Sequence, residues 1–364
     1  MAAMKRNLET TGKAEPAEAE KKPMSWKKEL CGLLCLLLAL ALFCAVIVPV
    51  LTPKRHDYGA VWGMYRQEPE NSVDTLFFGS SLAYCDIIPS VLYEETGVSS
   101  FVMAGPTQPM PVTYRYLREA CKTQSPKTVF IEVTGLVLKR DRSLKTNLTF
   151  LPWGAERLSL IFEETRGSDR TGLLFPLYAY HDRWDKLSLQ DVKEGLLGYE
   201  ADPLAGYTFL DEAMPIEGLS LRKVEVTPEE YERDAASLEK IVEFCKEQGI
   251  RPVFFLSPLP QRLDGQWLHR ITEDLEALGM GLVDFNEDFD EMGFTLSTDF
   301  YDPRHLNYRG AEKFSRYLAE RLPEWGVSPA GNGDDALWRQ RAARFDELRK
   351  EADSKPVRLN PAKE

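Results

Sequence analysis

Two short segments contain the residue types that serine-based acyl chemistry requires. In FFGSSLAYCD, Ser80 and Ser81 follow Gly79 at the end of an apolar run. In DFYDPRHLNYRG, Asp302 precedes His305 by three residues in a loop that contains a proline. A carboxylate at that spacing can hold one imidazole nitrogen and leave the other to take a proton from a serine hydroxyl. These segments predict a Ser-His-Asp group, although an ordinary turn after a strand also explains serines that follow a glycine.

The chain has four histidines, and only His305 has a carboxylate three residues before it. His56 lies beside two basic residues, and His269 lies in the amphipathic stretch QWLHRITEDL. Contact with solvent or ordinary packing explains both. His181, which Asp182 follows, lies in an aromatic-rich stretch from which it could contact a substrate. His305 is therefore the candidate base.

The elements that would position these residues alternate along the chain. Apolar runs rich in β-branched and aromatic residues predict strands at 73–79, 99–105, 127–133, 250–257 and 281–285. Amphipathic stretches, several followed by glycine, predict helices at 89–97, 111–124, 228–249, 266–279 and 307–322. This alternation indicates the α/β class, with a parallel sheet between two layers of helices. Ligands of such sheets gather beyond the carboxyl ends of the strands, where Ser81 is expected.

An uncharged apolar stretch lies near the N-terminus. Residues 30–53 comprise 24 consecutive residues without a charge. At ~1.5 Å per residue, a helix of this length exceeds the ~30 Å hydrocarbon core of a membrane. Seven Lys and Arg residues precede it and three follow closely, which predicts a single-pass membrane protein whose C-terminal body is extracytoplasmic. A cleaved signal peptide is the alternative, but its apolar core is only ~7 to 15 residues long.

Composition divides the remainder of the chain. Residues 139–226 interrupt the alternation with aromatic and turn residues. The chain becomes polar after Pro329, which predicts a short charged helix and a loose end. We expect a disordered cytoplasmic tail at 1–29, a transmembrane helix at 30–53, a linker at 54–71, an α/β domain at 72–327 with an insertion at 139–226, and a charged C-terminal tail at 328–364.

Charge and cysteine content exclude several classes of function. The 364 residues carry a net charge of −12, which argues against a broad electrostatic grip on nucleic acid. Three of the six cysteines lie in the apolar span, and the other three, Cys85, Cys121 and Cys245, lack metal-ligand spacing. We therefore predict small buried hydrophobic roles for these three, with neither a metal nor another cofactor.

The segments around Ser81 and His305 resemble conserved blocks of the SGNH/GDSL hydrolase superfamily. Its first block, G-D-S, is similar to Gly79-Ser80-Ser81, and its last, D-x-x-H, to Asp302-Pro303-Arg304-His305. The second block is matched more loosely by Gly105 in FVMAGPTQ. The resemblance covers residues 72–325 apart from the insertion, and it implies a three-layer flavodoxin-like SGNH sandwich. It further implies that Ser81 is the nucleophile, His305 the base and Asp302 its orienting acid, with oxyanion-hole N–H groups from Ser81 and Gly105.

The sequence differs from the motifs of this superfamily in two places. Ser80 stands where the family has aspartate, and the G-x-N-D block is absent from KTVFIEVTG. The oxyanion donor that this asparagine supplies is therefore unassigned, and Thr134 is a candidate by position only. The G-S-S and F-I-E-V segments, together with HLNYRGAEKF, are similar to a membrane-anchored branch that includes the D-alanyl-lipoteichoic acid protein D and the alginate O-acetylation proteins.

Members of that branch are partners of membrane-bound O-acyltransferases in bacterial envelopes. The resemblance thus implies a serine acyltransferase or esterase acting on acyl esters of a cell-envelope polysaccharide or an acyl carrier. A stand-alone carbohydrate or lipid esterase, or a catalytically silent scaffold for a membrane acyltransferase, remains open. Aromatic residues of the insertion could stack on sugars or simply pack; they are Trp153, Tyr178, Tyr180, Trp184 and Tyr207.

Overall fold

The computed structural model describes residues 26–52, 61–139 and 144–360, which fall into two units, residues up to Ile47 and residues from Val48 onward. The first unit consists of most of helix α1 (Trp26–Leu51). Among the described residues, α1 is the one helix that is long and apolar enough to cross a membrane. This fits a signal anchor or a signal peptide, and the orientation in a membrane stays a prediction. The expected tail lies outside the described residues except for its last four.

The second unit is built around a five-stranded parallel sheet with the strand order β2-β1-β3-β6-β8. Its strands are β1 (Thr75–Gly79), β2 (Ser100–Ala104), β3 (Thr128–Glu132), β6 (Arg251–Leu256) and β8 (Leu282–Asp284). Each lies within one of the five predicted strand segments. Numbered within this sheet alone, the order is the 2-1-3-4-5 of flavodoxin-like folds. The α/β prediction is therefore confirmed, and the residues of β1, β2 and β3 are all buried, as in sheets that helices cover on both faces.

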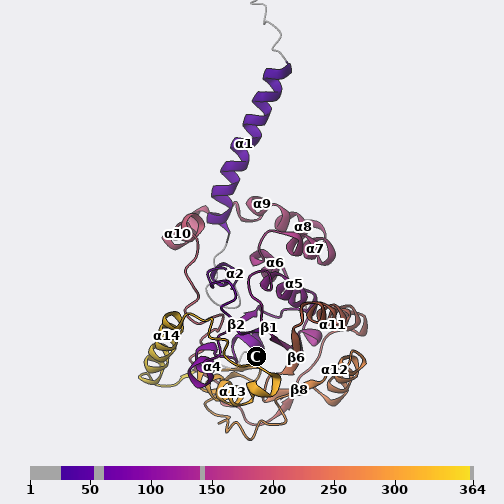
Figure 1. Ribbon diagram of the computed structural model, residues 1–364, viewed down its shortest axis with the longest axis vertical. Helices are drawn as coiled ribbons and strands as arrows, with labels where there is room; N and C mark the ends of the chain where they lie inside the picture. The colour runs from indigo at the N-terminus through magenta and orange to yellow at the C-terminus, as the bar shows by residue number, and fades with distance from the viewer. Residues whose placement is uncertain (1–25, 53–60, 140–143, 361–364) are drawn as a thin grey trace, which may run out of the picture. The chain divides into compact units, whose positions relative to one another are not determined.

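Alternate side chains of the strands enter two separate cores, because successive strand residues point to opposite faces. One core contains Phe78 and packs beneath α5 (Met110–Ala120), α11 (Pro228–Gln248) and α12 (Gly265–Ala277). The other contains Phe77 and packs beneath α4 (Pro89–Thr96) and α13 (Tyr308–Arg321). In Figure 1, α11 and α12 lie on one side of the sheet and α4 and α13 on the other. The three-layer arrangement and all five predicted helices are thus present.

Local sequence signals explain where the helices begin and end. At α11, Thr227 caps the helix and forms a reciprocal capping box with Glu230, and Pro228 occupies the first turn. Gly249 ends the helix in the left-handed conformation at φ 67°. Because these signals are short-range, the boundaries of α11 could be predicted from the sequence.

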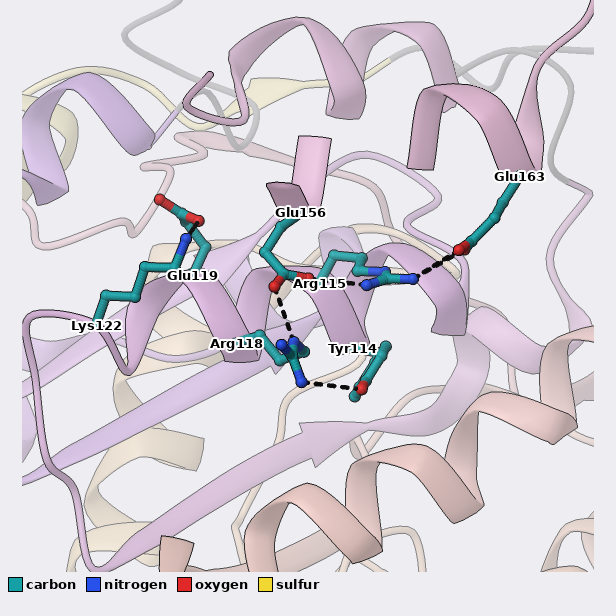
Figure 2. Close-up of polar contacts among 7 residues, drawn as sticks. All are labelled: Tyr114, Arg115, Arg118, Glu119, Lys122, Glu156 and Glu163. Carbon is teal, nitrogen blue, oxygen red and sulfur yellow. Dashed lines mark hydrogen bonds and ion pairs between the residues drawn. The ribbon is translucent and has the colours of Figure 1, made fainter. Parts of the chain in front are cut away.

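The segment expected as an insertion is mainly helical at first and extended later. Its helices pack near α5, where Arg115 and Arg118 from α5 pair with Glu156 of α7 (Figure 2). Tyr207 is buried, whereas the aromatic rings of Trp153 and Trp184 are exposed. Elements of this segment are α6 (Leu144–Phe150), α7 (Ala155–Glu164), α8 (Gly167–Leu174), α9 (Pro176–Tyr180), η2 (Trp184–Lys186), α10 (Leu189–Leu197), β4 (Glu212–Ala213) and β5 (Ser220–Leu221).

Two segments that were expected outside the α/β domain contain helices. Residues 61–71, expected as part of a linker, contain the buried helix α2 (Trp62–Tyr65). Residues 328–360, expected as a charged tail with a short helix and a loose end, contain the helix α14 (Asp335–Asp353), which is longer than expected. Shorter elements complete the unit: α3 (Ser81–Tyr84), η1 (Val133–Val137), β7 (Gln261–Arg262), β9 (Phe300–Asp302), β10 (His305–Leu306), η3 (Leu322–Trp325) and β11 (Arg358–Leu359).

A buried ion pair explains why these segments belong to the body. Arg341 of α14 is fully buried and binds the carboxylate of Glu68, while its Nε donates to the carbonyl of Asp202 at 2.9 Å. Trp338 and Phe345 lie on the same side of α14 and are also buried. The sequence did not indicate that this side of α14 is buried, because many charged residues surround Trp338, Arg341 and Phe345. An arginine is expected at the surface unless its ion-pair partner is known.

Candidate active site

The end of β1 gives its two serines different positions. Gly79 has φ 151°, and a Cβ there would lie 2.6 Å from the Cβ of Glu132, so only glycine fits. Ser80 is buried and caps α3, its Oγ accepting a hydrogen bond from the N–H of Leu82 at 3.3 Å. Ser81 begins α3 and is half-buried. The first serine is thus held within the turn, and the second is accessible.

Asp302 and His305 lie opposite each other in a small antiparallel hairpin formed by β9 and β10. Nδ1 of His305 lies 3.0 and 3.1 Å from the two carboxylate oxygens of Asp302. Nε2 of the same ring lies 2.8 Å from Oγ of Ser81. The structure therefore brings the three residues that the sequence singled out into one continuous hydrogen-bonded chain.

The charge state of Asp302 suits this chain of hydrogen bonds. Burial raises the pKa of Asp302, but the hydrogen bond and charge of His305, with help from Arg304, outweigh burial and hold the pKa below its usual value. An ionised Asp302 accepts a hydrogen bond from Nδ1–H, which leaves Nε2 of His305 as an acceptor for the Ser81 hydroxyl.

A second buried carboxyl group fixes the hairpin against α3. Oδ1 of Asp86 accepts a hydrogen bond from the N–H of Leu306 at 3.1 Å, next to His305 in the chain. Asp86 is fully buried, and this burial raises its pKa well above the usual range. Ser257 adds a hydrogen bond from its Oγ to the carbonyl of Leu82 at 2.9 Å. Sequence reasoning missed Asp86, although an acidic residue in the apolar run AYCDII is a signal for it.

Glu132, at the end of β3, is the third acidic residue of the site, after Asp302 and Asp86. Sequence reasoning missed it, as it missed Asp86. Its Oε2 accepts a hydrogen bond from Oγ of Ser80 at 3.0 Å, and its Oε1 accepts one from the N–H of Thr134 at 2.8 Å. Burial raises the pKa of Glu132. Thr134, considered as an oxyanion donor by position, therefore gives its N–H to Glu132.

Gly105 also differs from its expected arrangement. Its N–H donates to the carbonyl of Gly79 at 3.3 Å, along the edge where β2 meets β1. A Cβ at this position would lie 2.1 Å from Oδ1 of Asn147, so a glycine is needed for that close approach. The N–H of Ser81 makes no hydrogen bond within the described part of the chain. Of the expected oxyanion donors, Ser81 alone has a free N–H in this structure.

The remaining candidates lie elsewhere. His181 is exposed, with Nδ1 2.8 Å from the carbonyl of Tyr178, and His269 is exposed beside Glu273 on α12. His56 lies outside the described residues. Within the described ranges, no group of three or more His, Cys, Asp or Glu side chains is arranged to hold a metal ion. Cys85 and Cys245 are buried as expected, and Cys121 is partly buried.

Comparisons with known proteins give limited matches. A protein-family model that carries no functional description matches residues 220–325, less than half of the chain. No curated protein matches the sequence. A solved structure assigned to the lipolytic G-D-S-L family, from Desulfitobacterium hafniense DCB-2, is similar with a TM-score of 0.33 and 10% identity, over 68% of this chain and 97% of that chain.

Proposed function

We propose that this protein is a serine esterase or O-acyltransferase with Ser81 as nucleophile, His305 as general base and Asp302 as orienting acid. The observation that carries the proposal is the 2.8 Å contact between Oγ of Ser81 and Nε2 of His305, with Asp302 bound to the other ring nitrogen. A serine, an imidazole and an ionised carboxylate in this order are the components of acyl-transfer catalysis.

The reaction proceeds through an acyl-enzyme. Oγ of Ser81 attacks the carbonyl carbon of an acyl ester while its proton passes to Nε2 of His305, and the Ser81 N–H donates to the developing oxyanion. Collapse of the tetrahedral intermediate breaks the ester bond, and His305 returns the proton to the leaving alcohol. A second hydroxyl, from water or from an acceptor alcohol, then gives its proton to His305 and releases the acyl group.

Water exclusion and pocket shape decide whether water or an alcohol takes the acyl group. We place the reaction outside the cytoplasm, on acyl esters of a cell-envelope polysaccharide or of an acyl carrier, beside a membrane-bound O-acyltransferase. The apolar helix α1, the basic residues before it and the motif resemblance support this placement. A fusion that reports the compartment of residue 364 tests it, and a cytoplasmic C-terminus contradicts it.

Labelling with a fluorophosphonate tests the nucleophile. The full-length protein should gain one adduct, mapped by peptide mass spectrometry to Ser81, and Ser81→Ala should lose it. Ser80→Ala is the matched control, because loss of a turn hydroxyl costs on the order of 1 kcal/mol, about fivefold in rate. A label on Ser80, or one that survives in Ser81→Ala, contradicts the assignment.

A scaffold for a membrane acyltransferase is the second candidate. Two observations favour it: the Gly105 N–H is bonded to Gly79, and the N–H of Thr134 is bonded to Glu132. An oxyanion hole with one donor stabilises the transition state less than one with two or three. Absence of both labelling and hydrolysis of a chromogenic acetyl ester by the intact protein would favour the scaffold.

A further inference from the structure

A largely buried arginine near the candidate active site forms no ion pair with any residue that the structure describes. Residues 217–223 are exposed with one exception, Arg222, whose exposed fraction is 8%. Strand β5, directly before it, pairs with β7, and the N–H of Arg222 donates to the carbonyl of Arg262 at 2.7 Å. The backbone of this segment thus runs along the surface while the Arg222 side chain is turned inward.

Strand β7 connects Arg222 to the loop that carries Asp302 and His305. The N–H of Gln261, in β7, donates to the carbonyl of Pro303 at 3.1 Å. Pro303 lies between Asp302 and His305 in the chain. Arg222 is therefore one strand away from the Asp302–His305 hairpin.

Charged groups of the candidate active site act on the guanidinium of Arg222. Burial lowers the pKa of Arg222, the charges of Glu132 and Asp302 raise it, and the nearby Arg304 lowers it further. Glu132 binds Ser80, and Asp302 binds His305. The guanidinium of Arg222 is therefore close enough to both Glu132 and Asp302 to interact with their charges.

Within the described ranges, no acceptor lies at hydrogen-bond distance from the guanidinium of Arg222. Among the described residues, the Arg222 side chain makes no hydrogen bond, ion pair or ring contact, and its Nε is buried without a partner. The buried Arg341, by contrast, binds the carboxylate of Glu68. Arginine is almost never fully buried unless it is paired, because loss of hydration must be compensated. Glu132 does not supply that compensation, since its two oxygens already accept from Ser80 and Thr134 and burial raises its pKa.

We propose that Arg222 binds an anionic group of the substrate, a carboxylate or a phosphate, while the acyl ester lies on Ser81. This inference rests on the proposed function and deepens it by naming the substrate class. The guanidinium fork matches the oxygens of either anion. Arg304, exposed beside Asp302, adds positive charge at the same edge of a chain whose net charge is −12.

Two esters that differ only in charge test the proposal. Mono(4-nitrophenyl) succinate carries a free carboxylate, and its methyl ester is neutral with the same leaving group. The full-length protein in detergent should prefer the anionic ester at least tenfold in kcat/KM. Arg222→Gln should reduce this ratio to about one, mainly through KM, and Arg222→Lys should retain part of it.

Arg251→Gln is the matched control, because it removes the same charge from an exposed position at the amino end of β6. It should leave the ratio unchanged. Competitive inhibition by inorganic phosphate and by succinate distinguishes the two anions, and the stronger inhibitor identifies the group. An Arg222→Gln variant with the wild-type ratio, or with equal losses on both esters, overturns the proposal.

Anion binding is also measured without catalysis, which separates this inference from the proposed function. If the wild type hydrolyses neither ester and takes no fluorophosphonate label, the proposed function fails. Inorganic phosphate or succinate should still raise the unfolding temperature of the wild type and not that of Arg222→Gln. Equal stabilisation of both proteins, or of neither, overturns the role of Arg222.

Discussion

Two polar clusters of this protein differ in how their charges are balanced. Between α5 and α7, each charge has an opposite partner: Arg115 lies 2.9 Å from Glu156 and 2.7 Å from Glu163, and Arg118 lies 2.9 Å from Glu156 (Figure 2). Burial raises the pKa of Glu156, but its two arginine partners outweigh this and lower it. This cluster attaches one helix to another.

The cluster at the carboxyl end of the sheet is unbalanced. Asp86 and Glu132 are fully buried, make no ion pair within the described residues, and have pKa values raised by that burial. The buried Arg222 likewise has no ion-pair partner among the residues that the structure describes. Balanced pairs hold elements together, whereas buried groups with unused capacity are characteristic of functional sites. The contrast predicts that substitutions in one cluster change stability and those in the other change chemistry.

The largest effect should follow replacement of the candidate base. His305→Ala removes the proton acceptor of Ser81, so the rate of fluorophosphonate labelling should fall by about 10⁴-fold or more. The circular dichroism spectrum should not change. His269→Ala, at an exposed position beside Glu273 on α12, is the control and should label at the wild-type rate. Labelling of His305→Ala within tenfold of wild type would refute the triad.

Breaking the buried pair that anchors α14 should lower stability without affecting chemistry. Arg341→Met leaves Glu68 buried and unpaired, so the free energy of unfolding should fall by about 3 to 5 kcal/mol in urea titrations. Arg344→Met, at an exposed pair with Glu347, should stay within about 0.5 kcal/mol. The double variant Glu68→Leu/Arg341→Met should recover part of the loss. A loss equal to that of Arg344→Met would mean that the pair is not buried in solution.

The balanced cluster of Figure 2 should respond more mildly. Glu156→Gln removes the shared partner of two arginines and should cost about 1 to 2 kcal/mol of unfolding free energy. Glu163→Gln, whose side chain is 47% exposed, should cost less than about 1 kcal/mol. Both variants should label with the fluorophosphonate at the wild-type rate. A change in labelling would show that this cluster is coupled to the site.

The smallest effect should be a change in the pH dependence of stability at Glu132. Because the folded-state pKa is raised, the folded protein binds more protons than the unfolded chain above about pH 4.3, so wild-type stability declines as the pH rises through the folded pKa. Glu132→Gln removes this contribution. The stability of the variant relative to wild type should therefore increase from about pH 4 upward in urea titrations. A constant difference across that range would show that Glu132 titrates normally.

Local signals in the sequence determined the sheet, the helices and the identities of the candidate site residues. The five strands and five helices follow from hydrophobic period and from caps such as Thr227 and Gly249, which act over a few residues. Asp302 and His305 were recognisable because three residues separate them. A motif therefore located Ser81 and His305 although they are 224 positions apart in the sequence.

Only the tertiary structure decided which polar residues are buried and what they meet. Arg341 and Glu68 are 273 residues apart, and no local pattern distinguishes Arg341 from its exposed neighbours on α14. In the sequence, Glu132 lay in a predicted strand and Arg222 in the expected insertion, and only the strand pairing of the fold showed that both lie near the candidate site. Burial depends on long-range packing, and the free-energy cost of an unpaired buried group depends on burial. For this reason the sequence indicated the chemistry of the triad, whereas the charges around it could be assigned only from the fold.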